Sequence, residues 1–231
     1  MGADECQLVF EYVPGDLYQV LRGHQLKGTQ LPIEKVVQYS QDLLEGMHAC
    51  HQHRIIQRDL NPQNVLIHPV DGLKICDFGL ARIASVQAWN CTEGVTSLWY
   101  RGPELLLGHP RNPKYGPAVD IWSSGCIVVE MATGCPCFPG DCGIGTMFKI
   151  MQMLGSPTET AWPGFQETLT QWRPSFPKWP PTDLRAIRDK RPELGDAGMD
   201  LVAQLLAMSP AARPSARRAR AHAFLARPAP A

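Results

Sequence analysis

The chain has 231 residues, of which 44% are hydrophobic, so it is long enough for one domain of ordinary size with its own core. Its 22 Lys and Arg residues balance its 22 Asp and Glu residues, and the formal net charge is zero. This balance argues against a nucleic-acid-binding protein, because such proteins usually carry an excess of basic residues.

The first predicted element is a short strand at residues 7–13, which ends at Pro14-Gly15. A helix with one buried face is predicted from about Ile33 to His53, because apolar residues recur there at helical spacing. These apolar residues are Ile33, Val36, Val37, Leu43, Leu44 and Met47.

A small hairpin is predicted after this helix. Residues 64–68 and 73–76 are β-like, and Asp71-Gly72 between them is typical of a hairpin turn. Residues 78–118 hold many turn formers without a sustained period, which predicts a long loop of the kind that usually carries function.

The rest of the chain is predicted to be mainly helical. Residues 120–133 are apolar on nearly all sides, which indicates a buried helix. The other predicted segments are helices at 147–154, 199–207 and 216–225 and an extended Pro/Trp-rich stretch at 162–181. The predicted fold class is mainly α, with one strand and one β-hairpin, in one domain over residues 1–225 followed by a disordered tail at 226–231.

The cysteines and the N-terminus give no sign of secretion or membrane insertion. The eight cysteines form no C-x-x-C pair, so we interpret them as reduced and mostly buried. The N-terminus is acidic, unlike a signal peptide, and the longest apolar stretch, at 121–132, is too short and too polar to span a bilayer. We therefore expect a soluble, intracellular protein.

Three polar clusters lie in order around the predicted hairpin: Gln57–Asn64, Asp77-Phe78-Gly79 and Gly102-Pro103-Glu104. Phosphoryl transfer needs a carboxylate near the attacking hydroxyl and oxygen ligands that hold Mg²⁺ against the phosphates. Asp59, Asn64 and Asp77 are suitable side chains. The hairpin predicts that Asn64 and Asp77 lie close together, because they flank its two strands.

The clusters resemble the signature motifs of protein kinases, which are H-R-D-L-x-x-x-N, D-F-G and A-P-E. The corresponding sequences here are QRDLNPQN, DFG and GPE, in the same order. Six further stretches are similar to cyclin-dependent kinases: DFGLAR, SLWYRGPE, DIWSSGC, FPGD, LGSP and PSFPKW. The resemblance covers residues 8–225 and implies the hinge strand and C-terminal lobe of a cyclin-dependent-type kinase.

The resemblance implies a catalytic role for each matching residue. Asp59 would be the catalytic base, and Asn64 and Asp77 would bind Mg²⁺. The ATP-binding residues would be Phe10 as gatekeeper, Glu11 and Val13 through backbone contacts with adenine, Asp16 at the ribose and Leu66 on the floor of the adenine site.

Regulation and substrate choice are implied in the same way. Thr92 falls at the activating phosphothreonine, whose phosphate Arg58 and Arg82 would bind. The pocket for the proline of Ser/Thr-Pro substrates would be formed by Val95, Trp99 and Arg101. Glu104 and Arg213 would form a buried ion pair that stabilises the fold.

The sequence departs from the kinase pattern in several places. No G-x-G-x-x-G loop precedes Leu8, so we expect the chain to lack the N-terminal lobe, with its lysine–glutamate pair and main cyclin-contacting helix. Asn61 stands where these kinases carry a lysine that contacts the γ-phosphate, and Gln57 replaces a histidine whose role is mainly structural. Gly102 replaces alanine in A-P-E, and residues 141–145 depart from the motif that docks the small accessory subunit.

The expected function is that of an ATP- and Mg²⁺-dependent serine/threonine protein kinase of the cyclin-dependent type, which transfers the γ-phosphate to Ser/Thr-Pro sites. The alternative is a catalytically inactive, pseudokinase-like interaction module, which Asn61 and the missing lobe favour. The chain as written is expected to be inactive. Its expected partners are protein substrates and a cyclin, with no nucleic acid and no membrane, in the nucleus or cytoplasm.

Overall fold

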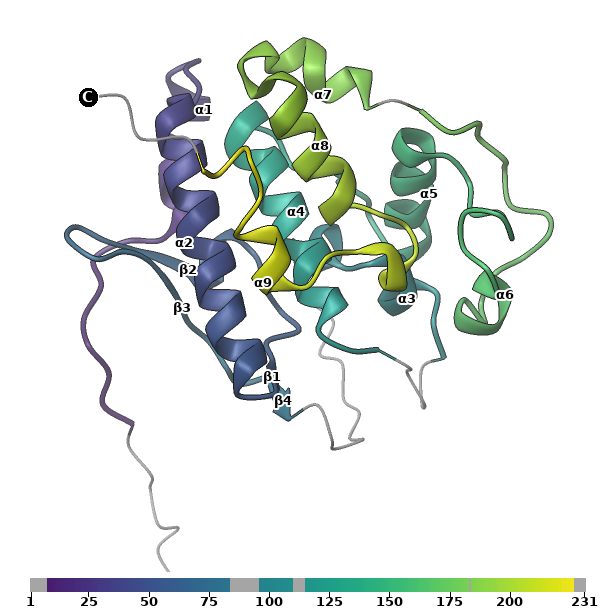
Figure 1. Ribbon diagram of the computed structural model, residues 1–231, viewed down its shortest axis with the longest axis horizontal. Helices are drawn as coiled ribbons and strands as arrows, with labels where there is room; N and C mark the ends of the chain where they lie inside the picture. Colours follow the sequence, from purple (N-terminus) through teal and green to yellow (C-terminus); the bar gives the residue numbers. More distant parts are fainter. Residues whose placement is uncertain (1–7, 84–95, 110–114, 183, 227–231) are drawn as a thin grey trace, which may run out of the picture.

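The computed structural model describes residues 8–83, 96–109, 115–182 and 184–226. Over these residues the chain is mainly helical, and its strands form two small two-stranded sheets. Figure 1 shows the helices gathered around α4 (Ala118–Thr133), with a hairpin beside α2 (Ile33–Gln52). The prediction of a mainly α fold with a hairpin is confirmed.

Helix α4 is the centre of the core. Residues 119–133 are all buried, and Trp122 stacks on Phe138 with ring centroids 5.6 Å apart. Helix α2 and helix α8 (Gly195–Leu205) both pack on α4. Gly125 permits the close approach of the segment at the end of α8, because a Cβ at this position would lie 2.8 Å from Leu206 Cδ2.

Helix α2 lies where the sequence predicted it and joins the core to the sheets. Its buried residues, Val36, Ser40, Leu43, Leu44 and Met47, follow helical spacing. The helix also packs against strand β3 and against α9 (Ala216–Ala219). It therefore fixes the hairpin relative to α4.

The hairpin pairs β2 (Val65–His68) with β3 (Gly72–Ile75) in an antiparallel ladder, with Val65 opposite Ile75. The predicted turn at Asp71-Gly72 is shifted, because the loop spans residues 69–71 and Gly72 already pairs with His68. Gly72 has φ 77°, a conformation that glycine adopts without steric cost. A second antiparallel pair joins β1 (Ile55–Ile56) to β4 (Arg82–Ile83).

The predicted N-terminal strand was wrong. Residues 8–13 contain no strand, and Val9 and Phe10 are 95% and 79% exposed. The apolar pattern suits a strand, but a strand also needs a neighbouring strand to complete its hydrogen bonds, and no described strand lies beside it. An isolated bridge between Asp16 and Leu66 is the nearest described β contact.

Helix α1 (Leu17–Leu26) was not predicted. It begins after Asp16, whose side chain accepts a hydrogen bond from the Gln19 N–H at 2.8 Å and so caps the helix. Only Leu17 and Leu21 are buried on it, so the apolar periodicity that normally reveals a helix is weak.

The remaining elements are short, apart from α5. They are η1 (Pro62–Asn64), η2 (Thr96–Tyr100), α3 (Pro103–Leu106), α5 (Gly143–Leu154), α6 (Phe165–Thr168), α7 (Arg185–Lys190), η3 (Pro192–Leu194) and η4 (Pro210–Ala212). Of the helix predicted at 216–225, only the first four residues are helical, as α9, and turns follow them. The helix predicted at 199–207 begins earlier, at Gly195, and the stretch at 162–181 contains α6.

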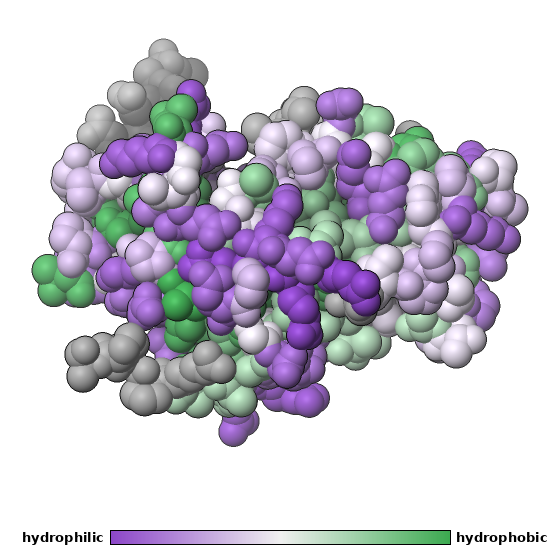
Figure 2. All heavy atoms as spheres, turned by 90° about the horizontal axis from the view of Figure 1, so that it is seen from above, coloured by the Kyte–Doolittle hydropathy of each residue, from purple (hydrophilic) through white to green (hydrophobic). Residues whose placement is uncertain are grey.

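The surface seen in Figure 2 is mostly hydrophilic, with hydrophobic residues in separate patches. Among the described residues, no helix combines the length and the apolar character needed to cross a membrane. Residues 227–231, which cover nearly all of the predicted tail, lie outside the described part of the chain.

Candidate active site

The segment from Gln57 to Asn64 is a loop between β1 and β2, and α4 holds its beginning. The buried carboxylate of Asp120 accepts the backbone N–H of Gln57 at Oδ2 (3.0 Å) and that of Arg58 at Oδ1 (2.9 Å). His51 Nε2, from α2, lies 2.9 Å from the same Oδ2. Asp120 stands in the first turn of α4, where the helix dipole favours a negative charge.

Asp59 is held by amide side chains on both sides of its backbone. Its N–H donates to Gln57 Oε1 (2.7 Å), and its carbonyl oxygen accepts Nδ2 of Asn61 and Nδ2 of Asn64, both at 2.8 Å. Asn64 Nδ2 also lies 3.4 Å from Asp59 Oδ2. The carboxylate of Asp59 and the amide of Asn64 therefore face one another.

Asn61 is used inside the loop. Its Oδ1 accepts the N–H of Gln63 at 3.0 Å and caps η1, while its Nδ2 donates to Asp59. Only 8% of the residue is exposed. The side chain that stands in the lysine position of the kinase motif therefore stabilises the turn instead of projecting into solvent.

Asp77 is brought to the same loop by the hairpin. The N–H of Cys76 donates to the carbonyl oxygen of Asn64 (3.0 Å), and Gln57 Nε2 donates to the carbonyl oxygen of Asp77 (3.0 Å). Asp77 has φ 54°, and its Oδ1 accepts the N–H of Gly79 at 3.1 Å. The predicted closeness of Asn64 and Asp77 is thus seen in the backbone contacts that join their segments.

The donor atoms fit a divalent cation bound together with phosphates. Asn64 Nδ2 faces two oxygens of Asp59, so its Oδ1 is the atom that it can offer to a metal. Asp77 adds an exposed carboxylate. Mg²⁺ prefers oxygen ligands and is usually held by one or two protein side chains plus phosphate oxygens.

Of the residues expected to bind the nucleotide, Leu66 lies on the hairpin, and Asp16 and Glu11 contact it. Leu66 bridges to Asp16 and pairs with Lys74 across the ladder, and Lys74 Nζ makes an ion pair with Glu11 at 2.8 Å. Burial, followed by the charges of Asp77 and Asp16, raises the pKa of the Cys76 thiol, so both carboxylates lie near this cysteine. Phe10 is exposed and Val13 half-buried.

The two arginines expected to bind phosphate lie next to this loop. Arg58 Nε donates to the Leu80 carbonyl (2.7 Å), and its Nη1 donates to the Tyr115 hydroxyl (2.5 Å). Arg82 pairs in the β1–β4 ladder with Ile56, which lies two residues before Arg58 in the sequence. The buried Nε of Arg82 has no hydrogen-bond partner in the described structure. Thr92, the expected phosphorylation site, lies outside the described residues.

The expected substrate pocket is described only in part. Trp99 Nε1, in η2, donates to the carbonyl oxygen of Gly140 at 2.9 Å, which ties η2 to the loop before α5. Arg101 follows η2 and is half-buried. Val95 lies outside the described residues.

Glu104 and Arg213 form a bidentate ion pair, with Nη1–Oε1 at 2.5 Å and Nη2–Oε2 at 2.9 Å. Their side chains are 0% and 1% exposed for Arg213 and Glu104, respectively. Arg213 also donates to the carbonyl oxygens of Ala118, Ala207 and Met208. The pair joins α3 to the start of α4 and the segment after α8.

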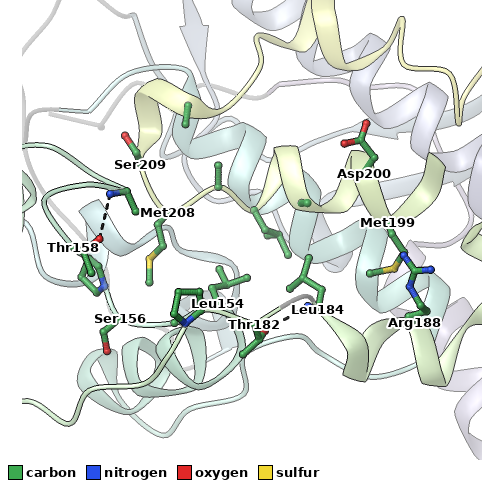
Figure 3. Close-up of a pocket in the computed structure, with 18 of the residues that line it drawn as sticks. Leu154, Ser156, Thr158, Thr182, Leu184, Arg188, Met199, Asp200, Met208 and Ser209 are labelled. Carbon is green, nitrogen blue, oxygen red and sulfur yellow. Dashed lines mark hydrogen bonds between the residues drawn. The ribbon is translucent and has the colours of Figure 1, made fainter. Parts of the chain in front are cut away.

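A cavity of about 530 Å³ lies away from this loop, between the end of α5 and α8 (Figure 3). Its charged lining residues have protein partners, since Arg188 pairs with Asp196 at 2.9 Å and Asp200 lies 2.9 Å from His222. Most of its exposed lining is apolar. It contains none of the residues expected to act in catalysis.

Sequence reasoning missed three contributors to the site: His51, Asp120 and the contacts of Gln57. Asp120 was seen only as the start of a buried helix, and Gln57 only as a substituted motif residue. Apart from the contact of Gln57 with Asp59, their partners lie 19 to 69 positions away in the chain. A polar residue within an apolar run, as Asp120 is, was the one available signal, because buried carboxylates need partners.

Comparison with known proteins points to the same chemistry. Residues 2–225 match the protein kinase domain family. The chain is 43% identical over 219 residues to cell division control protein 2 homolog 3 of Trypanosoma brucei brucei, a match that covers 93% of this chain and 67% of that protein. The chain therefore belongs to the protein kinase family and is similar to its cyclin-dependent members.

Proposed function

We propose that the chain is an ATP-dependent serine/threonine kinase of the cyclin-dependent type, acting on Ser/Thr-Pro sites, with Asp59 as base and Asn64 and Asp77 as metal ligands. The observation that carries the proposal is that hydrogen bonds link the segments of Asp59, Asn64 and Asp77 around one loop. Asn64 faces the carboxylate of Asp59, and Gln57 contacts the backbone of both Asp59 and Asp77.

The residues divide the chemistry between them. The carboxylate of Asp59 accepts the proton of the attacking hydroxyl and orients that hydroxyl toward the phosphate. Asn64 and Asp77 supply oxygens to Mg²⁺, which when bound neutralises charge on the phosphate oxygens. Asn64 also holds the carboxylate of Asp59 through its Nδ2, which limits the orientations that the base can adopt.

The adenosine part of ATP would lie along the hairpin. Leu66, on β2, offers an apolar surface beside Asp16, and the ion pair between Lys74 and Glu11 links the segment before Asp16 to the neighbouring strand β3. Asp16 keeps acceptor capacity for a ribose hydroxyl, although it also accepts from Gln19, because a carboxylate has about four lone-pair sites.

Substrate choice and partners are the finer parts of the proposal. Trp99 is fixed by its hydrogen bond to Gly140, which gives a rigid aromatic wall for a substrate proline. Arg58 and Arg82 supply guanidinium groups for a phosphate on Thr92. The relative's printed name concerns cell division control, which supports a cyclin as the partner proposed for this chain.

Phosphoryl transfer from γ-labelled ATP tests the proposal. The full chain is incubated with Mg²⁺ and a Ser-Pro or Ser-Ala peptide, with and without a cyclin. Although the sequence pattern alone led us to expect an inactive chain, the contacts that join Asp59, Asn64 and Asp77 around one loop favour transfer. We therefore expect label on the Ser-Pro peptide, and we expect Asp59→Asn to lower the rate by about 10²–10⁴-fold. The matched control is Asp71→Asn, a carboxylate at the hairpin turn that pairs with Lys74.

A non-catalytic interaction module is the second candidate, and Asn61 favours it. Its amide is buried in the loop and brings no positive charge to the γ-phosphate. Under this candidate the chain binds ATP in a calorimetric titration, yet wild type and Asp59→Asn give the same background label. Transfer that depends on Asp59 excludes it.

A further inference from the structure

A second cavity, of about 460 Å³, lies where α9 packs against α2. Figure 1 shows these two helices side by side. The walls of the cavity are the second half of α2, the start of α4 and residues 213–217, which lead into α9. None of the residues expected to act in catalysis is among the described residues that line it, so the proposed function does not use this cavity.

The described lining of this cavity is basic. It contains His48 and His51 from α2 and Arg213 and Arg217 from the segment that leads into α9, whereas it contains no Asp or Glu. Arg213 and His51 are bound to buried carboxylates of the core. His48 and Arg217 make no hydrogen bond or ion pair with other described residues. They are therefore the basic groups that a ligand in the cavity could use.

A third side chain adds donors to this pair. Gln52 also lines the cavity, has no partner among the described residues, and lies four positions after His48, on the same face of α2. The guanidinium of Arg217 has five N–H donors, an amide has two and an imidazole has at least one. A phosphate monoester offers three acceptor oxygens and a charge of about −1.5 to −2 at pH 7. It can accept from all three side chains at once, which suits it better to this donor set than a carboxylate.

The other lining residues favour a peptide over a membrane surface. Ile121 and Ala216 line the cavity and are almost completely buried, so they form a recessed apolar wall against which a neighbouring side chain of a peptide can pack. Membrane-binding surfaces instead use large apolar side chains that project into the lipid. None of the exposed large hydrophobic residues in the described part of the chain lines this cavity.

The residues after Arg217 add positive charge outside the cavity. Arg220 pairs with Glu45, and Arg218 is exposed and is not among the lining residues. These charges attract anions from solution, an effect that salt weakens. Arg218 has the same charge as Arg217 and is its neighbour on the same short helix. It therefore provides a matched control that separates binding inside the cavity from general attraction.

We propose that this cavity binds a phosphorylated serine or threonine segment of a protein partner. The phosphate accepts hydrogen bonds from Arg217, His48 and Gln52, and an apolar residue next to the phosphorylated one packs on the recessed wall. The binding is noncovalent and involves no catalytic residue. It gives the chain a docking site for phosphorylated proteins that is separate from the loop of Asp59.

An NMR titration of the full chain tests the proposal. The probe is acetyl-Gly-Leu-pSer-Leu-Gly-amide, and two comparison peptides carry serine or glutamate in place of phosphoserine. We expect the phosphopeptide to shift the Nε–H resonance of Arg217 in a saturable way. It should bind at least about tenfold more tightly than the glutamate peptide, because one further hydrogen bond to a charged group contributes about this factor. The serine peptide should cause no shift.

Three variants place the phosphate, with the ³¹P resonance of the peptide as the readout. Arg217→Gln should raise the Kd by about 10–100-fold, because it removes charge-assisted hydrogen bonds. His48→Leu removes the imidazole donor and should raise the Kd by about 3–10-fold. Arg218→Gln removes the same charge as Arg217→Gln from the neighbouring position and should raise the Kd by at most about fivefold.

Several results would overturn the proposal. Equal losses in Arg217→Gln and Arg218→Gln would reduce the effect to general attraction, and equal binding of the phosphoserine and glutamate peptides would remove the preference for phosphate. No saturable shift at millimolar peptide, or shifts at Arg58 and Arg82 without one at Arg217, would show that the cavity is not the binding site. Sedimentation with phosphatidylcholine–phosphatidylserine vesicles, without peptide binding, would identify a membrane surface instead. The titration contains no ATP, so its outcome does not depend on whether the chain transfers phosphate.

Discussion

Among the single residues of the site, Asn61 shows most clearly how a side chain can serve the local backbone. Its two hydrogen bonds, to Asp59 and from Gln63, use one donor and the acceptor of its amide. A lysine at this position could donate but could not accept, so it could not cap η1. The loop therefore gains a rigid turn where the related motif carries a positive charge.

Asn61→Lys is expected to change stability and activity in opposite directions. The lost cap should lower the free energy of unfolding by about 0.5–2 kcal/mol. The new ammonium group can approach the γ-phosphate and should raise kcat, by up to about 10²–10³ if it acts as a preorganised charge. Urea unfolding and peptide phosphorylation measure the two effects.

Gln63→Lys is the control for this change, because it adds the same charge at an exposed neighbouring position and keeps Asn61. It should leave the free energy of unfolding nearly unchanged. A stable Asn61→Lys variant with unaltered kcat would show that neither the cap nor the missing charge matters.

Between elements, the ion pair of Glu104 and Arg213 is a bidentate polar link whose side chains are almost completely buried. It joins α3 to the segment between η4 and α9, and the guanidinium carbon lies 4.8 Å from the centroid of the Trp122 ring. All the hydrogen-bonding nitrogens of Arg213 have partners. Such a pair is costly to break on one side, because the remaining charge stays buried.

Arg213→Ala should therefore lower the free energy of unfolding by about 3–5 kcal/mol. Arg220→Ala is the control, because Arg220 pairs with Glu45 at the surface, where such pairs contribute at most about 1 kcal/mol. Chemical unfolding of the two variants measures the contrast. Equal losses in both would contradict the structural role assigned to the buried pair.

The sequence predicted the elements whose signal is local and missed those that depend on distant partners. Helices α2 and α4 were predicted because apolar spacing or a continuous apolar run marks each of them. The strand at 7–13 was wrong because a strand depends on a neighbour that a local pattern cannot supply. Helix α1 was missed because only Leu17 and Leu21 are buried on it, so its apolar pattern is too short to be recognised. Its clearest sequence signal is the capping residue Asp16.

The same distinction applies to the site. The order of the motifs and the predicted hairpin correctly placed Asn64 near the segment of Asp77, since the contact crosses one short hairpin. The contacts of Gln57 with Asp77, and of Asp120 with His51, arise only from the packing of α4 against α2 and the loop. Spacing along the sequence does not encode such contacts.

At the scale of the whole molecule, α4 carries a buried carboxyl group, that of Glu130, which links stability to pH. Burial raises the pKa of Glu130 from 4.5 to about 7, against the smaller opposing effect of the hydrogen bond from Tyr100 at 2.7 Å. Below pH 4.5 the carboxyl group is protonated in both the folded and the unfolded chain. Between these two pKa values it ionises only in the unfolded chain, so stability falls as the pH rises.

Glu130→Gln should remove this dependence and keep an acceptor for Tyr100. Relative to the variant, wild type should lose up to about 1.4 kcal/mol of unfolding free energy per pH unit between pH 4.5 and 7, and little more above pH 7. Urea unfolding at a series of pH values measures the difference, with the exposed Glu34→Gln as control for a lost charge. Parallel pH profiles for wild type and Glu130→Gln would contradict the assignment.

The central claim is that Asp59 and Asp77 work as parts of one phosphoryl-transfer site, and a double-mutant cycle on kcat tests it most directly. Groups that act as a unit give strongly non-additive losses, whereas independent groups give losses that multiply. The account predicts that Asp59→Asn and Asp77→Asn each abolish most of the activity. It also predicts that the double variant is no more than about tenfold slower than the slower single variant. A double variant whose loss equals the product of the two single losses, or an Asp77→Asn variant as active as wild type, would contradict it.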